Sequence, residues 1–170
     1  MKNISLIIIL FLPLFLQAQE YKFGKVSKAE LEEKFYPLDS TANAAILYTE
    51  RKTNFEYSNV NGFFIVEKYF TRLKIYNKEG FENATQKILA YYNTSNKEKV
   101  TDIKATTYNL IDGKIVKNKL SKKNIYREAE NKLYNSVKFT LPNLKPGSVI
   151  EWAYTFKSPF IAMFNEVKLQ

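Results

Sequence analysis

The sequence predicts a mainly β protein, an antiparallel β-sandwich or a strongly curved sheet, with one short N-terminal helix after a signal peptide. From residue 44 onward, short runs of β-branched and aromatic residues alternate with turn residues, a pattern typical of antiparallel sheets. Four of the five glycines follow a turn-forming partner and divide the chain into β units: Asn61-Gly62, Glu79-Gly80, Asp112-Gly113 and Pro146-Gly147.

Residues 1–18 have the three zones of a secretory signal peptide. Lys2 supplies the positive charge, a mostly apolar run follows, and Ala18 is the small residue after which we expect cleavage. The alternative is a membrane anchor, but a spanning helix needs roughly 20 apolar residues. The apolar run here is shorter and contains the helix-breaking Pro13. We therefore expect an exported chain in which residues 19–170 form one β-rich domain, with no stable membrane span after cleavage.

A short helix is the first element predicted after the leader. Ser27 and Glu30 have the spacing of a capping box, and Val26 and Leu31 have that of a hydrophobic staple. Leu31 and Phe35 are placed to share one face of this helix.

The β region is predicted to begin with a hairpin, in which residues 45–50 and 54–58 pair around a turn at residues 51–53. Asp112-Gly113 predicts a second, two-residue hairpin turn. Residues 124–128 are predicted as a strand, although a helical stripe is the alternative there. Further strands are predicted over residues 86–92, 100–111 and 137–141.

A long strand is predicted over residues 63–76. Its odd positions form an apolar face that is broken by Glu67 and Thr71. Its even positions are expected to direct three basic side chains outward, those of Lys68, Arg72 and Lys74.

The last predicted strand follows a type II turn at Pro146-Gly147 and ends at Ser158-Pro159. Its alternation places Ile150, Trp152, Tyr154 and Phe156 on one face and Val149, Glu151, Ala153 and Thr155 on the other.

Four segments of the chain, in order, resemble the domain of unknown function 3857. They are FGKVS at 23–27, YPLDSTA at 36–42, LKIYNKEG at 73–80 and FTLPNLKPGSVIEWAY at 139–154. The resemblance implies an exported protein of a Gram-negative bacterium, in the periplasm or at the cell surface, with this domain ahead of a transglutaminase-like domain. The final residues, 165–170, read as the opening of another strand, so we expect the domain to be truncated at its C-terminus.

The composition excludes most catalytic chemistry. The chain has no Cys and no His, so it has no thiol nucleophile, no catalytic triad of the Ser-His-Asp or Cys-His type, and no Cys/His metal site. The Cys-His-Asp constellation that the resemblance implies for a transglutaminase-like domain has no counterpart here. We therefore predict no enzyme activity, no metal site and no cofactor.

Five residues are candidates for ligand binding. Glu151 is a carboxylate within an apolar strand, where it either acts as a general acid or pairs with a lysine across the sheet. Trp152, Tyr154, Tyr91 and Tyr92 are either platforms for sugar rings or parts of the core. Since neighbouring strand residues point to opposite faces, one of Tyr91 and Tyr92 is expected to leave the core.

These features predict a non-catalytic, exported β-domain that binds or positions a partner. The partner is a protein, a cell-envelope polymer or a downstream transglutaminase-like domain. The alternative is a carbohydrate-binding or carboxylate-dependent glycan-active domain. The net charge of +9 favours an anionic surface or polysaccharide over nucleic acid, because export separates the chain from nucleic acid.

Overall fold

The computed structural model describes residues 21–60, 62–95 and 97–162. The predicted signal peptide, its cleavage site at Ala18 and the C-terminal residues 165–170 lie outside the described residues. None of the helices in the described ranges is long and apolar enough to cross a membrane.

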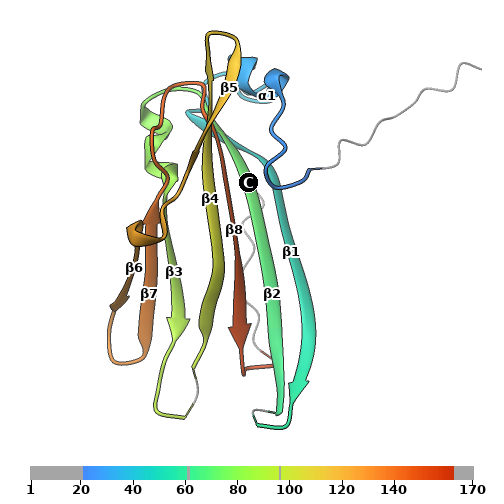
Figure 1. The fold of residues 1–170 in the computed structure, drawn as a ribbon, viewed down its shortest axis with the longest axis vertical. Helices are drawn as coiled ribbons and strands as arrows, with labels where there is room; N and C mark the ends of the chain where they lie inside the picture. Colours follow the sequence, from blue (N-terminus) through green and yellow to red (C-terminus); the bar gives the residue numbers. More distant parts are fainter. Residues whose placement is uncertain (1–20, 61, 96, 163–170) are drawn as a thin grey trace, which may run out of the picture.

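Two antiparallel sheets make up the fold, which confirms the predicted mainly β class (Figure 1). The five-stranded sheet has the order β1 (Ala44–Ser58), β2 (Gly62–Ile75), β8 (Val149–Ser158), β4 (Lys99–Ile111) and β5 (Lys114–Lys119). The three-stranded sheet has the order β3 (Thr85–Tyr91), β7 (Tyr134–Thr140) and β6 (Ile125–Ala129). The helical elements are α1 (Lys28–Glu32) and two 3-10 turns, η1 (Glu79–Ala84) and η2 (Lys122–Asn124).

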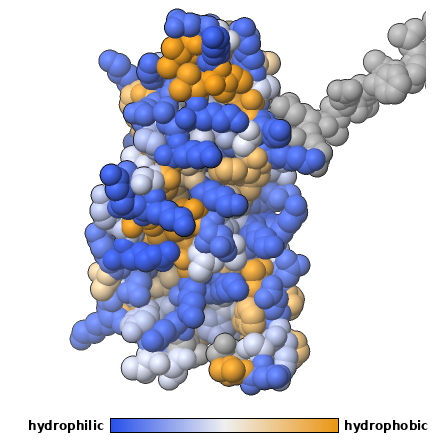
Figure 2. Space-filling model, in the orientation of Figure 1, coloured by the Kyte–Doolittle hydropathy of each residue, from blue (hydrophilic) through white to orange (hydrophobic). Residues whose placement is uncertain are grey.

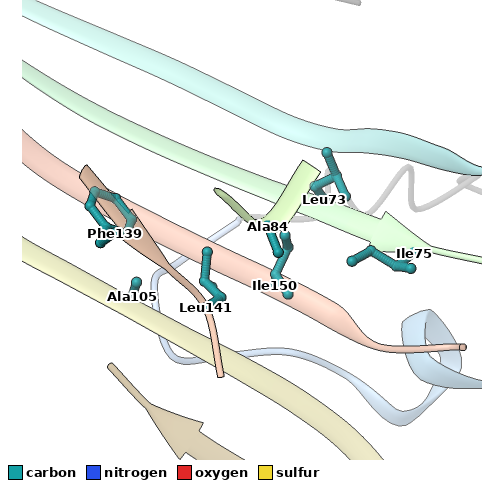
Figure 3. Packing of buried hydrophobic residues seen from close by; sticks show 7 residues of the cluster. All are labelled: Leu73, Ile75, Ala84, Ala105, Phe139, Leu141 and Ile150. Carbon is teal, nitrogen blue, oxygen red and sulfur yellow. The ribbon is translucent and has the colours of Figure 1, made fainter. Parts of the chain in front are cut away.

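The main core lies between the two sheets. Leu73, Ile150 and Ala105 come from the large sheet and meet Phe139 of β7 and Leu141 just beyond it (Figure 3). All five side chains are buried. One face of the large sheet, which we call the inner face, therefore packs against the small sheet, and the opposite face is called the outer face.

The N-terminal segment, residues 21–37, lies against the outer face. Ser27 and Glu30 form the predicted capping box at the start of α1, and Leu31 packs with Val26 against Tyr108 of β4. The helix ends at Glu32, so the predicted stripe of Leu31 and Phe35 is wrong, and Phe35 is exposed. Pairing of Glu30 with the sheet and burial of Leu31 hold this short helix in place.

The predicted hairpin around residues 51–53 is wrong, because β1 is one continuous strand of 15 residues. Arg51 and Thr53 do not turn the chain but face Glu67 of β2, which forms an ion pair with Arg51 at 3.5 Å. The turn comes later, between Ser58 and Gly62, where Gly62 has a φ of 68° that suits glycine. Arg51 and Thr53 are polar because they face Glu67 across the strand pair, and they do not mark a turn.

Two of the three basic residues expected to point outward from β2 are buried. Lys68 is exposed as predicted, but Arg72 is 1% exposed and Lys74 is fully buried. Both side chains do lie on the outer face of the sheet, where the N-terminal segment covers them. The prediction of their direction was right and that of their exposure was wrong.

The turns predicted at Asp112-Gly113 and Pro146-Gly147 are confirmed, and so are the later strands. Asp112 and Gly113 have φ values of 48° and 72°, as a type I′ turn requires. Gly147 has a φ of 88°, and Ser148 N donates to Lys145 O across the second turn. The ambiguous segment is a strand, β6, rather than a helix.

Candidate functional site

A buried cluster of charges joins the N-terminal segment to the outer face of the large sheet. Arg72 on β2 lies directly opposite Glu151 on β8, and Arg72 Nε donates to Glu151 Oε1 at 2.7 Å. The other nitrogens of Arg72 donate to Glu30 Oε1 at 2.7 Å and to Lys22 O at 2.9 Å. One guanidinium therefore connects two strands, α1 and the segment before it.

Glu151 uses both carboxylate oxygens in this cluster and is fully buried. Its second oxygen, Oε2, accepts from Gly24 N and from the Tyr108 hydroxyl, each at 2.8 Å. Burial lowers the pKa of Arg72, but the hydrogen bonds and charges of Glu30 and Glu151 outweigh it and raise that pKa above its ordinary value. The guanidinium of Arg72 is therefore held in its charged form.

Lys74 lies beside this cluster and makes different contacts. Its Nζ donates to Leu31 O at 2.9 Å, near the end of α1, and to Gly147 O at 2.8 Å in the type II turn. Burial lowers the pKa of Lys74 to about 8. The side chain links the helix to the turn that starts β8.

These contacts bear on the two interpretations of Glu151, as a general acid or as one member of a cross-strand pair. Of the two interpretations, the cross-strand pair matches the observed contacts, although the cation is Arg72 rather than a lysine. A general acid must reach its substrate, whereas the side chain of Glu151 is inaccessible and all its described partners are hydrogen-bond donors to the carboxylate.

Trp152 and Tyr154 lie on the inner face of the large sheet, whereas Glu151 lies on the outer face. Trp152 is partly buried and packs against the main core, and Tyr154 stacks on Tyr69 with 4.6 Å between ring centroids. Burial raises the pKa of Tyr69 to about 12, aided by its hydrogen bond to Glu67. The structure thus does not bring Glu151 together with the aromatic candidates beside it in sequence.

Tyr91 and Tyr92 lie at the end of β3 and differ in exposure, as predicted. Tyr91 is partly buried and makes edge-on ring contacts with Tyr134 and Phe160. Tyr92 is exposed, with Lys97 Nζ 4.9 Å from its ring centroid. These two residues belong to the three-stranded sheet and the loop after it, away from Trp152 in the register of the strands.

A hydrophobic surface that the sequence did not predict lies at the end of the β1–β2 hairpin. Phe55, Tyr57 and Phe63 share the inner face and are 59%, 62% and 62% exposed, and Val60 in the turn is 90% exposed. We call these four residues the hairpin surface. Figure 2 shows hydrophobic atoms at this lower end of the molecule among mostly hydrophilic ones. The inner face, which forms the core elsewhere in the large sheet, is therefore not covered by another layer of the described chain at this end of the hairpin.

The hairpin surface adjoins an open strand edge. In the described chain β1 pairs only with β2, so β1 is one edge of the large sheet along its 15 residues. The other edge, β5, has 6 residues and carries Lys114, Lys117 and Lys119, which is a common protection against unwanted pairing. β1 also carries Arg51 and Lys52 and has a register shift between Ile46 and Tyr48, but it is the longer of the two edges, and its last residues, from Thr53 to Ser58, contain no lysine.

Metal-binding geometry is not found within residues 21–60, 62–95 and 97–162, where no three acidic side chains gather closely enough to hold an ion.

The architecture and surfaces define a class: a two-sheet antiparallel β-domain with a buried charge cluster under its N-terminal segment.

A family model matches residues 66–166, so the chain belongs to the family DUF3857, a domain of unknown function with a solved structure. The matched part includes Arg72 and Glu151 and begins after β1. The predicted family is thereby confirmed.

The fold is also similar to a crystal structure described as "a putative protease from Parabacteroides distasonis ATCC 8503". The TM-score is 0.51 and the sequence identity 14%, over 68% of this chain and 23% of that chain. At this identity the likeness concerns the fold alone, and the chain spans less than a quarter of the protein it matches. The chain has no match among curated proteins.

Proposed function

We propose that this chain is a non-catalytic, exported β-domain that binds and positions a protein partner through the hairpin surface and the edge of β1. The observation that carries this proposal is the gathering of four exposed hydrophobic side chains at the end of one hairpin. Contiguous exposed apolar patches on soluble domains commonly mark sites of interaction.

The chemistry of this surface favours a protein over a polysaccharide as the partner. Aromatic side chains are enriched in the buried centres of protein interfaces, and Tyr57 and Phe63 already contact each other edge-on at 5.1 Å. The adjacent edge of β1 offers backbone N–H and C=O groups to an added strand. Strand addition would supply hydrogen bonds while the aromatic rings supply apolar contact.

A transglutaminase-like domain is the partner class that the family resemblance implies. The similar solved chain is more than four times as long as the part that this protein covers, which supports a role as one module beside others. We carry no protease activity over to this chain, since it contains neither Cys nor His and its buried Glu151 is fully hydrogen-bonded.

Site-specific photocrosslinking tests the proposal. A photoreactive phenylalanine analogue replaces Tyr57 in one version of the protein and Tyr126 in another, and each is expressed in the native host. Tyr126 is a matched control, because it is 57% exposed but lies on β6 of the other sheet.

We expect crosslinks to one defined protein from position 57 and none to that protein from position 126. Addition of the Phe55→Ser substitution should weaken the crosslink from position 57, because it removes a neighbouring contact. Equal crosslinking from both positions, or none from position 57, would contradict the proposal.

A further inference from the structure

A groove with three lysines lies on the outer face, near the turn of the β1–β2 hairpin. It has a volume of about 560 Å³ and is lined by Lys97, Lys99 and Lys157, with Phe64 and Pro159 among its other walls. We call it the lysine groove. Its lysines lie on the opposite face of the sheet from Phe55, Tyr57 and Phe63, and the groove shares only Val60, in the turn, with the hairpin surface.

Two of these lysines occupy an unfavourable position. Lys99 of β4 lies directly opposite Lys157 of β8 in the strand register. Like charges directly opposite each other on neighbouring strands destabilise a sheet. A second pair of the same kind lies nearby on this face, where Lys52 of β1 is opposite Lys68 of β2. Lys52 forms an ion pair with Glu50 at 3.1 Å, so the groove lysines are the main concentration of positive charge at this end of the outer face.

No carboxylate in the described part of the chain forms an ion pair with the three groove lysines. Glu98 lies between two of them in sequence, but its oxygens accept from Ser158 Oγ and Tyr91 N, each at 2.7 Å. Lys157 instead lies 5.8 Å from the centroid of the Phe64 ring. Asp102 interacts electrostatically with Lys157 without forming an ion pair with it, so most of the positive charge of the groove is available to a ligand.

We propose that the lysine groove binds the phosphate group of a phosphate ester. Three ammonium groups around one hollow suit a compact anion with more than one negative charge, and lysine binds phosphate as a point charge. The apolar walls formed by Phe64 and Pro159 favour an ester, whose organic part can contact them, over free phosphate. A soluble ester and a lipid headgroup both carry this chemistry.

Titration calorimetry distinguishes these sources. Glucose 6-phosphate is the soluble probe, and vesicles of phosphatidylcholine with or without phosphatidylglycerol are the lipid probe. The test variant is Lys97→Gln/Lys99→Gln/Lys157→Gln. The matched control is Lys114→Gln/Lys119→Gln/Lys122→Gln, which removes the same charge from exposed positions in and after β5.

We expect the groove variant to bind roughly tenfold or more weakly to the probe that the native protein binds, and the control to change little. The unfolding midpoint of the groove variant should be unchanged or higher than that of the native protein, because repulsion between Lys99 and Lys157 is removed. Binding of the soluble ester, or of the phosphatidylglycerol vesicles alone, supports the proposal and identifies the source. Absence of binding to both, or equal weakening by both variants, overturns it.

Discussion

Arg72 and Glu151 lie directly opposite each other on β2 and β8, and both are buried under the N-terminal segment. A buried ion pair is tolerated only when its remaining hydrogen-bonding groups also find partners. Here Glu30, Gly24 and Tyr108 supply them. The pair therefore fixes where the N-terminal segment docks on the sheet.

Substitution of Glu151 should destabilise the fold strongly. In Glu151→Gln, Arg72 keeps only Glu30 as a charged partner, so we expect the free energy of unfolding to fall by about 3 kcal/mol, as for other broken buried pairs. Urea unfolding monitored by circular dichroism measures this change. Glu130→Gln, which breaks pairs at the surface, is the control and should leave the midpoint nearly unchanged. Similar midpoints for the two variants would contradict this account of the cluster.

The lowered pKa of Lys74 should make the free energy of unfolding depend on pH. Its pKa is about 8 in the folded protein and has an ordinary value of 10.5, so between these values the unfolded chain binds more protons than the folded protein. The free energy of unfolding should therefore rise as the pH increases from 8 to 10, at most by about 1.4 kcal/mol per pH unit. Above pH 10 the raised pKa of Tyr69 acts in the opposite direction.

Chemical unfolding at several pH values between 8 and 10 checks this prediction. Lys74→Met should lose the rise, whereas Lys68→Met, which changes an exposed lysine on the same strand, should keep it. A rise that persists in Lys74→Met would show that another group causes it.

Gly80 should be the least replaceable of the turn glycines. A Cβ at this position would lie 2.4 Å from the backbone oxygen of Asn43, which cannot move away without disturbing the start of β1. We expect Gly80→Ala to lower the free energy of unfolding by roughly 2–3 kcal/mol. Gly113→Ala is the comparison, because its Cβ would meet open space and the cost comes only from a φ of +72°. A smaller loss for Gly80→Ala than for Gly113→Ala would contradict the predicted clash.

Charge on the hairpin surface should reduce self-association. An open strand edge with exposed aromatic residues promotes contacts between copies. We therefore expect Tyr57→Lys to lower the weight-average mass at high protein concentration in sedimentation velocity, with little change in the unfolding midpoint. Tyr126→Lys, at a similarly exposed tyrosine of β6, should have no such effect. If both variants behave alike, self-association does not depend on this surface.

The carbohydrate hypothesis stays a prediction. Trp152 is the only tryptophan, so its fluorescence reports on the inner face of β8 during a titration with envelope polysaccharides. A response would favour glycan binding there without the participation of Glu151, which lies on the opposite face.

Elements defined by neighbours in the sequence were predictable. The capping box of Ser27 and Glu30, the Asp112-Gly113 turn and the alternation along β8 depend on a few consecutive residues, and the structure confirms them. Prediction failed at residues 51–53, where polar residues resemble a turn but instead face Glu67 on the neighbouring strand. The hairpin surface was missed for a related reason, since alternation identifies an apolar face but does not say whether another layer covers it.

By itself, the sequence determined most of the strands, the turns at Asp112-Gly113 and Pro146-Gly147 and the faces on which side chains lie, because dihedral preferences and alternation are local properties of the chain. Only the tertiary structure decided which of those faces are buried. Arg72 and Lys74 point away from the core as alternation requires, yet the N-terminal segment, about 40 residues earlier in the chain, buries them. Burial depends on which distant segments pack together, and the free energy of those contacts is not encoded in any short stretch of residues.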